Sequence, residues 1–384
     1  MKELELLPRG SMIIAFIIFS ERVMQSKRLD SLTSLRAFAA LGVFFSHMGF
    51  IQNSSNEYLA STFKYFNLGY SGVTFFFILS GFILTYSFTN TKKVSVVKFS
   101  DFLMHRIFRI YPVHILCLFI FIVSKMYYMP EYSINESQLI KNALLLQSFS
   151  VNKNDYFSFN AVSWSISVEM FFYVCFCFVI FAPKRTIFVF SALLIAIIIY
   201  LSSLDAVSES ISHWFYYISP LMRLPDFMIG ILICKLYLCI ENAPSKFILS
   251  VAESVSLISI AISLYIAANV SYLGGLKFDV IFIPSMAFAV LAFSFNGGVI
   301  SKLISSKAFI LFGDASFAFY LIHAIVISVL HRYIDTSKTD LSEAISFIAI
   351  ALVISMITAI FIFILYEKPI NKKLRAVWDK IPEK

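Results

Sequence analysis

Long apolar runs, bounded by charged or turn-forming residues, recur along this chain of 384 residues and constrain its fold more than any other feature. One of them reads GVTFFFILSGFILTYSF at residues 72–88. A run of about 20 apolar residues is the length that an α-helix needs to cross the hydrocarbon core of a membrane. Only 14% of the residues are charged, whereas a soluble domain has about a quarter. We therefore predict an all-α integral membrane protein.

The apolar runs predict a bundle of about ten transmembrane helices. The expected spans are 32–52, 69–89, 111–129, 163–182, 186–204, 214–240, 247–269, 279–296, 309–330 and 342–366. Lys and Arg residues favour connecting segments on the cytoplasmic side of a membrane. Most of them lie inside when the N-terminus is placed in the cytoplasm, so both termini are predicted to be cytoplasmic.

The expected organisation is a cytoplasmic N-terminal extension at 1–28, a transmembrane domain at 29–370 and a basic cytoplasmic tail at 371–384. The net charge of +8 fits contact with anionic lipid headgroups. No basic patch interleaved with aromatic residues lies outside the spans, so nucleic acid is not an expected partner. The five cysteines fall in apolar runs without a CxxC pair, and no metal site is expected.

Four ionisable residues from different expected spans reach a similar depth in the outer half of the membrane. They are His47, Glu169, Arg223 and His323, placed by a rise of about 1.5 Å per helical residue. Ionisable groups inside a bilayer are costly and usually serve function. These residues therefore form a candidate site, although a structural polar network is the alternative.

A second cluster is expected on the cytoplasmic side. Arg106 and Arg109 are three residues apart and share a helix face, and Arg36 is available on the same side. The pair either anchors the protein by the positive-inside rule or binds an anion such as a nucleotide phosphate. In the second span, Gly72 and Gly81 allow either close helix approach or room for a ligand.

Seven motifs in sequence order resemble the acyltransferase-3 family, membrane proteins that O-acylate bacterial surface and secreted glycans. The resemblance covers about 29–370. Departures are Met170, where many members have a second Glu, and Asp226, where many have Glu. The motifs are Arg36 and His47 separated by ten residues, GVTFFFILSGF at 72–82, RIFRIYP at 106–112, WSISVEMFF at 164–172, RLPDFMIG at 223–230, FAFYLIHA at 317–324 and YEKP at 366–369.

The resemblance implies transfer of an acyl group, acetyl by family habit, from cytoplasmic acetyl-CoA to a hydroxyl of a glycan or lipid-linked saccharide. The expected location is the inner or plasma membrane of a bacterium, without a metal. Arg36, Arg106 and Arg109 are expected to hold the phosphates of CoA. His47 is expected to act as general base or transient acyl carrier, with Glu169 orienting its imidazole.

Four further residues are expected on the substrate side of the site. Arg223 could steady a carboxylate or an oxyanion, and His323, Trp164 and Ser165 lie at a similar level on the expected topology. The rival function is a polytopic transporter or flippase of a sugar-linked or anionic substrate, because several spans with ionisable groups suit transport as well. Transport would move substrate without consuming acyl-CoA.

Overall fold

The computed structural model describes residues 28–54, 56–90, 99–334 and 340–380. Within these ranges the chain is helical and contains no β-strand, which confirms the all-α class. The extension predicted at 1–28 lies almost entirely outside the described residues. The helices, in chain order, are α2 (Asp30–Ser46), α3 (Glu57–Asn67), α4 (Gly72–Asn90), α5 (Phe99–Tyr128), α6 (Glu136–Ala143), α7 (Lys153–Tyr156), α8 (Trp164–Val179), α9 (Lys184–Ser203), α10 (Glu209–His213), α11 (Leu224–Tyr237), α12 (Lys246–Asn269), α13 (Ile283–Ser294), α14 (Val299–Ile304), α15 (Lys307–Asp314), α16 (Ser316–Leu330), α17 (Leu341–Ile362) and α18 (Lys368–Trp378).

The described residues contain six helices long and apolar enough to cross a membrane, or eight if each of two bent helix pairs counts as one span. The protein is therefore a multi-pass membrane protein, but the expected count of ten is not reached. Two expected spans are too short in the structure. The span at 32–52 is the 17-residue helix α2, and the span at 214–240 reduces to the 14-residue helix α11.

One bent pair interrupts the ninth expected span. Helices α15 and α16 meet at an angle of 66°, and the sequence Gly313–Asp314–Ala315–Ser316 lies at the break. Gly313 packs directly on the backbone carbonyl of Thr33 in α2, so a Cβ at this position would overlap that oxygen. The break therefore brings α15 against α2.

Helices α4 and α11 form the most extensive helix contact of the bundle. A Cβ at Gly81 would overlap the carbonyl of Phe227, and a Cβ at Gly230 would overlap that of Ile78. Because both glycines let the opposite backbone approach, the two helices touch at backbone distance. Gly72 packs in the same way on the carbonyl of Ala39, which confirms close packing as the use of these small residues.

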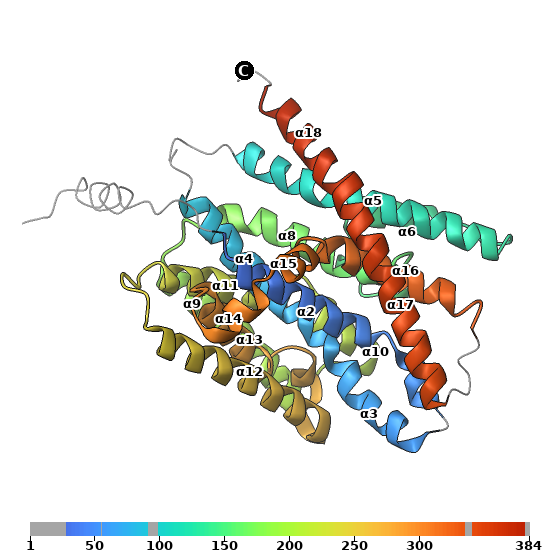
Figure 1. Cartoon of the computed structure of the whole chain (residues 1–384), viewed down its shortest axis with the longest axis horizontal. Helices are drawn as coiled ribbons and strands as arrows, with labels where there is room; N and C mark the ends of the chain where they lie inside the picture. Colours follow the sequence, from blue (N-terminus) through green and yellow to red (C-terminus); the bar gives the residue numbers. More distant parts are fainter. Residues whose placement is uncertain (1–27, 55, 91–98, 335–339, 381–384) are drawn as a thin grey trace, which may run out of the picture.

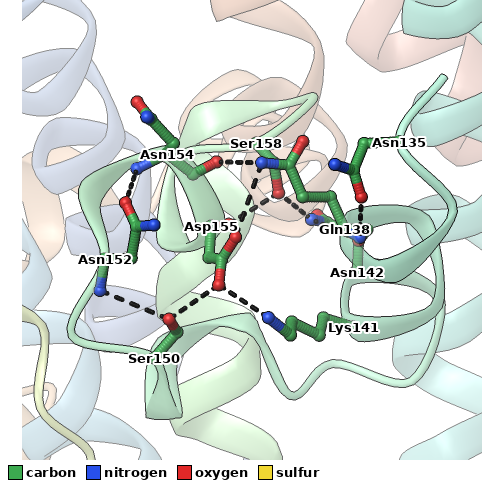
Figure 2. A network of polar contacts seen from close by, with 9 residues as sticks. All are labelled: Asn135, Gln138, Lys141, Asn142, Ser150, Asn152, Asn154, Asp155 and Ser158. Carbon is green, nitrogen blue, oxygen red and sulfur yellow. Dashed lines mark hydrogen bonds and ion pairs between the residues drawn. The ribbon is translucent and has the colours of Figure 1, made fainter. Parts of the chain in front are cut away.

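The segment between α5 and α8 folds into a compact polar network (Figure 2). Lys141 Nζ lies 2.6 Å from Asp155 Oδ2, and Ser150 Oγ donates a hydrogen bond of 2.8 Å to the same oxygen. The segment is fixed to the bundle by Asn160 Nδ2, which donates to the carbonyl of Leu321 in α16 at 2.8 Å. It therefore holds the N-terminal end of α8 against α16.

Figure 1 shows α5 along one edge of the bundle, with the long rod of α17 and α18 crossing it. A π-helical turn, η7 (Phe363–Glu367), joins α17 to α18. Pro369 follows at the start of α18. Because proline has no N–H and its ring crowds the carbonyl four residues earlier, an ordinary helical turn is disfavoured here. The wider π turn lets the rod continue past the proline.

Candidate active site

A cavity of about 200 Å³ opens between α2, α4, α5, α8 and α16. Its apolar lining comes mainly from α4, and its charged groups come from α2, α5 and α8. The polar residues that line it are Thr33, Arg36, Ser80, Arg106, Arg109, Ser165, Glu169, Tyr173, Ser316 and Tyr320. We call this space the arginine cavity.

Three guanidinium groups converge on the arginine cavity, from α2 (Arg36) and from α5 (Arg106 and Arg109). The Arg106 guanidinium lies 5.5 Å from the centre of the Phe102 ring, and its Nε is buried without a hydrogen-bond partner. Among the described residues, none of the three lies within 4.0 Å of a carboxylate. The cavity therefore carries positive charge that its own side chains do not pair.

Glu169 lines the same cavity, on the helix that faces the guanidinium groups. Its Oε1 accepts hydrogen bonds from Tyr173 and from Ser80 Oγ at 3.3 Å. The structure describes no hydrogen bond between Glu169 and His47. The expected function of this carboxylate in orienting His47 therefore stays a prediction.

His47 and His323 lie next to each other, outside the arginine cavity. His47 Nδ1 is 2.8 Å from the carbonyl of Val43, and His323 Nδ1 is 3.1 Å from the carbonyl of Phe319. Because a carbonyl oxygen only accepts, each Nδ1 carries the proton. His323 Nε2 lies 3.4 Å from His47 Nδ1 and can accept a second hydrogen bond from the proton on that Nδ1. His47 Nε2 is thus left with a free lone pair, on a residue exposed at the protein surface.

Tyr320 lies between the arginine cavity and the two histidines. It lines the cavity, and its ring centre is 6.0 Å from that of His323. Its hydroxyl is 2.7 Å from Ser165 Oγ and 3.2 Å from the carbonyl of Val162. Ser165 therefore holds the ring that separates the two halves of the candidate site.

Arg223 is fully buried and does not line the cavity. It is ion-paired with Asp226 at 3.0 Å and with Asp279, and it donates to Thr74 Oγ1 at 3.0 Å. The ring of Phe77, 5.1 Å from the guanidinium carbon, separates it from the cavity. The structure therefore places Arg223 in a buried network rather than beside His47, Glu169 and His323.

Trp164 is also buried on the far side of Phe77, with its ring 4.8 Å from that of Tyr217 and 6.4 Å from that of Phe77. It shapes the wall behind the cavity and does not line the cavity itself. Within the described ranges, no three His, Cys, Asp or Glu side chains come together as a metal site would require.

The sequence did not single out several residues that complete the site. Tyr173 follows Glu169 by four residues, a spacing that puts both on one helix face. Ser80 and Tyr320 lie within motifs that were identified, but the sequence assigned neither of them a function in the site. Glu367, buried at the π turn, interacts electrostatically with Arg109 and Arg36.

Comparisons with known proteins give a consistent result. A family model described as an acyltransferase domain matches residues 29–367. The chain is 28% identical over 328 residues to "Acyltransferase MdmB" of Streptomyces mycarofaciens, covering 79% of this chain and 80% of that protein. It is 22% identical over 396 residues to "O-acetyltransferase OatA" of Staphylococcus aureus, covering 95% of this chain and 60% of that protein.

Further staphylococcal relatives, 24% identical over 332 residues, are covered over 52% of their length. The chain thus spans about half to three fifths of the staphylococcal proteins that it matches. No solved structure is significantly similar to this chain.

Proposed function

The chain belongs to the acyltransferase-3 family, and from that premise we propose that it transfers an acyl group from acyl-CoA to a hydroxyl of a cell-surface glycan or lipid-linked saccharide. Acetyl is the proposed acyl group, because relatives are named O-acetyltransferases. The proposed location is the inner or plasma membrane of a bacterium. The distribution of Lys and Arg supports cytoplasmic termini, which puts Arg36 at the cytoplasmic end of α2.

The observation that carries this proposal is the set of three unpaired guanidinium groups around the arginine cavity. Arg36, Arg106 and Arg109 face a cavity without a carboxylate ion pair of their own. Arginine suits phosphate because its planar fork donates two parallel hydrogen bonds. The buried, unpartnered Nε of Arg106 adds a donor that an oxyanion could satisfy. CoA carries its phosphates at one end, which fits binding from the cytoplasmic side.

The proposed catalytic residue is His47. It follows Arg36 by eleven residues and caps the C-terminal end of the same helix, so the two lie about 16 Å apart along the helix axis. The pantetheine arm of CoA is long enough, in rough terms, to cover much of that distance. The ring of Tyr320 stands in the way, so the proposal requires this side chain to move when the thioester passes.

His47 Nε2 has the free lone pair that the reaction needs. As general base it takes the proton of the acceptor hydroxyl while the hydroxyl oxygen attacks the thioester carbonyl, and the thiolate leaves with its electron pair. Alternatively, Nε2 itself attacks the thioester and carries the acyl group to the acceptor. In both cases the imidazole of His47 becomes positively charged. The lone pair of His323 Nε2, which lies beside His47 Nδ1, stabilises that charge.

The test uses inside-out membrane vesicles, acetyl-CoA labelled in the acetyl group, and the native glycan. The proposal predicts label in the glycan for the wild type, and a raised KM for acetyl-CoA in Arg109→Gln. Lys184→Gln removes an exposed cation at the start of another helix and should leave KM unchanged. If labelled acetyl-CoA stays intact while a sugar-linked substrate crosses the membrane, the protein is a transporter and the proposal is wrong.

A further inference from the structure

The last helix of the described chain is docked on α5, close to the arginine cavity. Trp378 Nε1 donates to Asp101 Oδ1 at 2.9 Å, and His105 Nε2 lies 3.1 Å from Asp379 Oδ1. The Trp378 ring also packs edge-on against Phe108 at 6.1 Å. Two polar contacts and one aromatic contact fix α18 beside the segment of α5 that carries Arg106 and Arg109. Figure 1 shows the two helices crossing.

One face of η7 and α18 lies against α5, because Arg375 Nη2 reaches the carbonyl of His105 in α5. Glu367, Asn371 and Arg375 are four apart in sequence and share one helix face, as residues at this spacing do. The π turn ends at Glu367, and the side chain of Glu367 is buried. We call the line between these residues and α5 the terminal seam.

The terminal seam contains buried polar atoms without hydrogen-bond partners. They are Glu367 Oε2, Asn371 Oδ1 and Arg375 Nε, and Arg106 Nε lies on the α5 side. Arg375 Nη2 reaches the carbonyl of His105, but at 3.5 Å this hydrogen bond is weak. Buried polar groups in folded proteins are nearly always paired, and leaving one unpaired is costly. Of these atoms, Arg375 Nε and Arg106 Nε are donors that an anionic ligand would satisfy, whereas the oxygens of Glu367 and Asn371 are acceptors that it would not.

The charge of the terminal seam indicates the sign of that ligand. Arg375 interacts electrostatically with Arg109 and with Arg106, so the seam continues the guanidinium cluster of the arginine cavity. Among the described residues, Arg375 makes no ion pair within 4.0 Å. Glu367 supplies one negative charge near Arg36 and Arg109. Glu169 and Asp379 also lie near these groups, and Asp314 is paired with Arg28. The four guanidinium groups therefore exceed the nearby carboxylates by one charge, which favours an anion.

We propose that Arg375, with Asn371 beside it, binds a phosphate of the acyl donor, so that α18 forms one wall of the donor site. This inference rests on the proposed function and names a residue outside the family match, which ends at 367. The sequence had indicated only a basic tail from 371. A phosphate group could also come from an anionic lipid headgroup, because α18 carries exposed lysines, and the test separates the two sources.

The test measures binding of coenzyme A to the full-length protein in lipid nanodiscs. The variants are Arg375→Gln, which removes the charge, and Arg375→Lys, which keeps the charge but loses the planar fork. Lys372→Gln is the matched control, since Lys372 is an exposed cation on the same helix. Each protein is measured in pure phosphatidylcholine and with added phosphatidylglycerol. A thermal melt of each variant verifies folding.

The inference predicts about tenfold weaker binding of coenzyme A by Arg375→Gln, the loss expected for one charge-assisted hydrogen bond. Arg375→Lys should recover part of that loss, and Lys372→Gln should match the wild type in both lipids. Equal affinities for wild type and a folded Arg375→Gln would overturn the inference. So would a loss in Arg375→Gln seen only with phosphatidylglycerol, since the bound phosphate would then be a lipid headgroup. Failure of the wild type to bind coenzyme A would instead overturn the proposed function.

Discussion

His323 Nε2 lies 3.4 Å from His47 Nδ1, and the two imidazole rings meet edge to face with their centres 5.0 Å apart. Each ring is also bonded through Nδ1 to the carbonyl four residues earlier in its own helix. These contacts set the tautomer of both rings. His47 is left with an unprotonated Nε2 at the surface, and His323 with a lone pair directed at the His47 proton.

His323 should act as a positioning residue for His47. We expect His323→Ala to lower kcat about ten- to hundredfold, a part of what a complete general base contributes. KM for acetyl-CoA should not change, because the proposed donor-binding arginines lie in a separate cavity. His323→Asn, whose amide can still donate to the carbonyl of Phe319, should recover part of the rate. Steady-state kinetics measure both constants, and a raised KM with normal kcat would contradict this assignment.

The buried Arg223 network should be essential for stability and sensitive to the balance of charge. Arg223→Met leaves two buried carboxylates, Asp226 and Asp279, without their partner, and breaking such a pair costs about 3–5 kcal/mol. Asp226→Asn should cost much less, since one guanidinium cannot neutralise two carboxylates, and Arg223 stays paired with Asp279. Thermal midpoints in one detergent test this order. Equal loss of stability in the two variants would show that the charge argument is wrong.

Close contact between α4 and α11 should make Gly81 intolerant of a side chain. In Gly81→Ala the new Cβ meets the Phe227 carbonyl, and such overpacking costs about 1–3 kcal/mol. Gly49→Ala is the matched control, because nothing lies within 4 Å of a Cβ at that position. We expect a lower thermal midpoint only for Gly81→Ala. If both variants melt like the wild type, the two helices are not packed at backbone distance.

The polar network of Figure 2 should loosen in acid. The hydrogen bond from Lys141 is the main cause of a lowered pKa at Asp155, outweighing partial desolvation, and Ser150 adds to the effect. A carboxyl group whose pKa is lower in the folded state stabilises that state above its unfolded pKa, and the contribution is lost as the pH falls through the folded value. We therefore expect stability of this segment at neutral pH and its loss below about pH 4.

Hydrogen exchange of residues 135–158 at pH 7 and pH 3 measures this effect. Asp155→Asn removes the titrating group and should show exchange that depends less on pH after correction for the intrinsic rate. Protection that falls equally with pH in Asp155→Asn and wild type would assign the acid sensitivity to another group.

The sequence predicted the architecture well where the apolar runs are long. Helices α9, α12 and α17 are 20, 24 and 22 residues long and mostly apolar, so length and hydropathy identify them directly. The spans assigned to α2 and α11 are shorter than expected because α2 ends before the apolar run does and α11 starts after the run has begun. Asn53 closes a 3₁₀ turn beyond α2, and Arg223 precedes the start of α11. Hydropathy does not detect such breaks.

Part of the candidate site was also predictable. The spacing of Arg106 and Arg109 put both on one helix face, and the family motifs marked Arg36, His47 and His323. Asp279, the second partner of Arg223, was not predictable, because it comes from a loop 56 residues later in sequence and meets Arg223 only through helix packing. For the same reason the approach of Arg375 to the α5 arginines needed the structure.

The most direct measurement of the central claim is acetyl transfer by the purified protein in reconstituted vesicles, with and without His47. Labelled acetyl-CoA is supplied on one side and the native glycan on the other, for wild type and for a His47→Ala variant shown to be folded and inserted. The account predicts labelled glycan with the wild type and a loss of at least about a hundredfold with His47→Ala, as for removal of a general base or nucleophile. Full transfer by His47→Ala would contradict it.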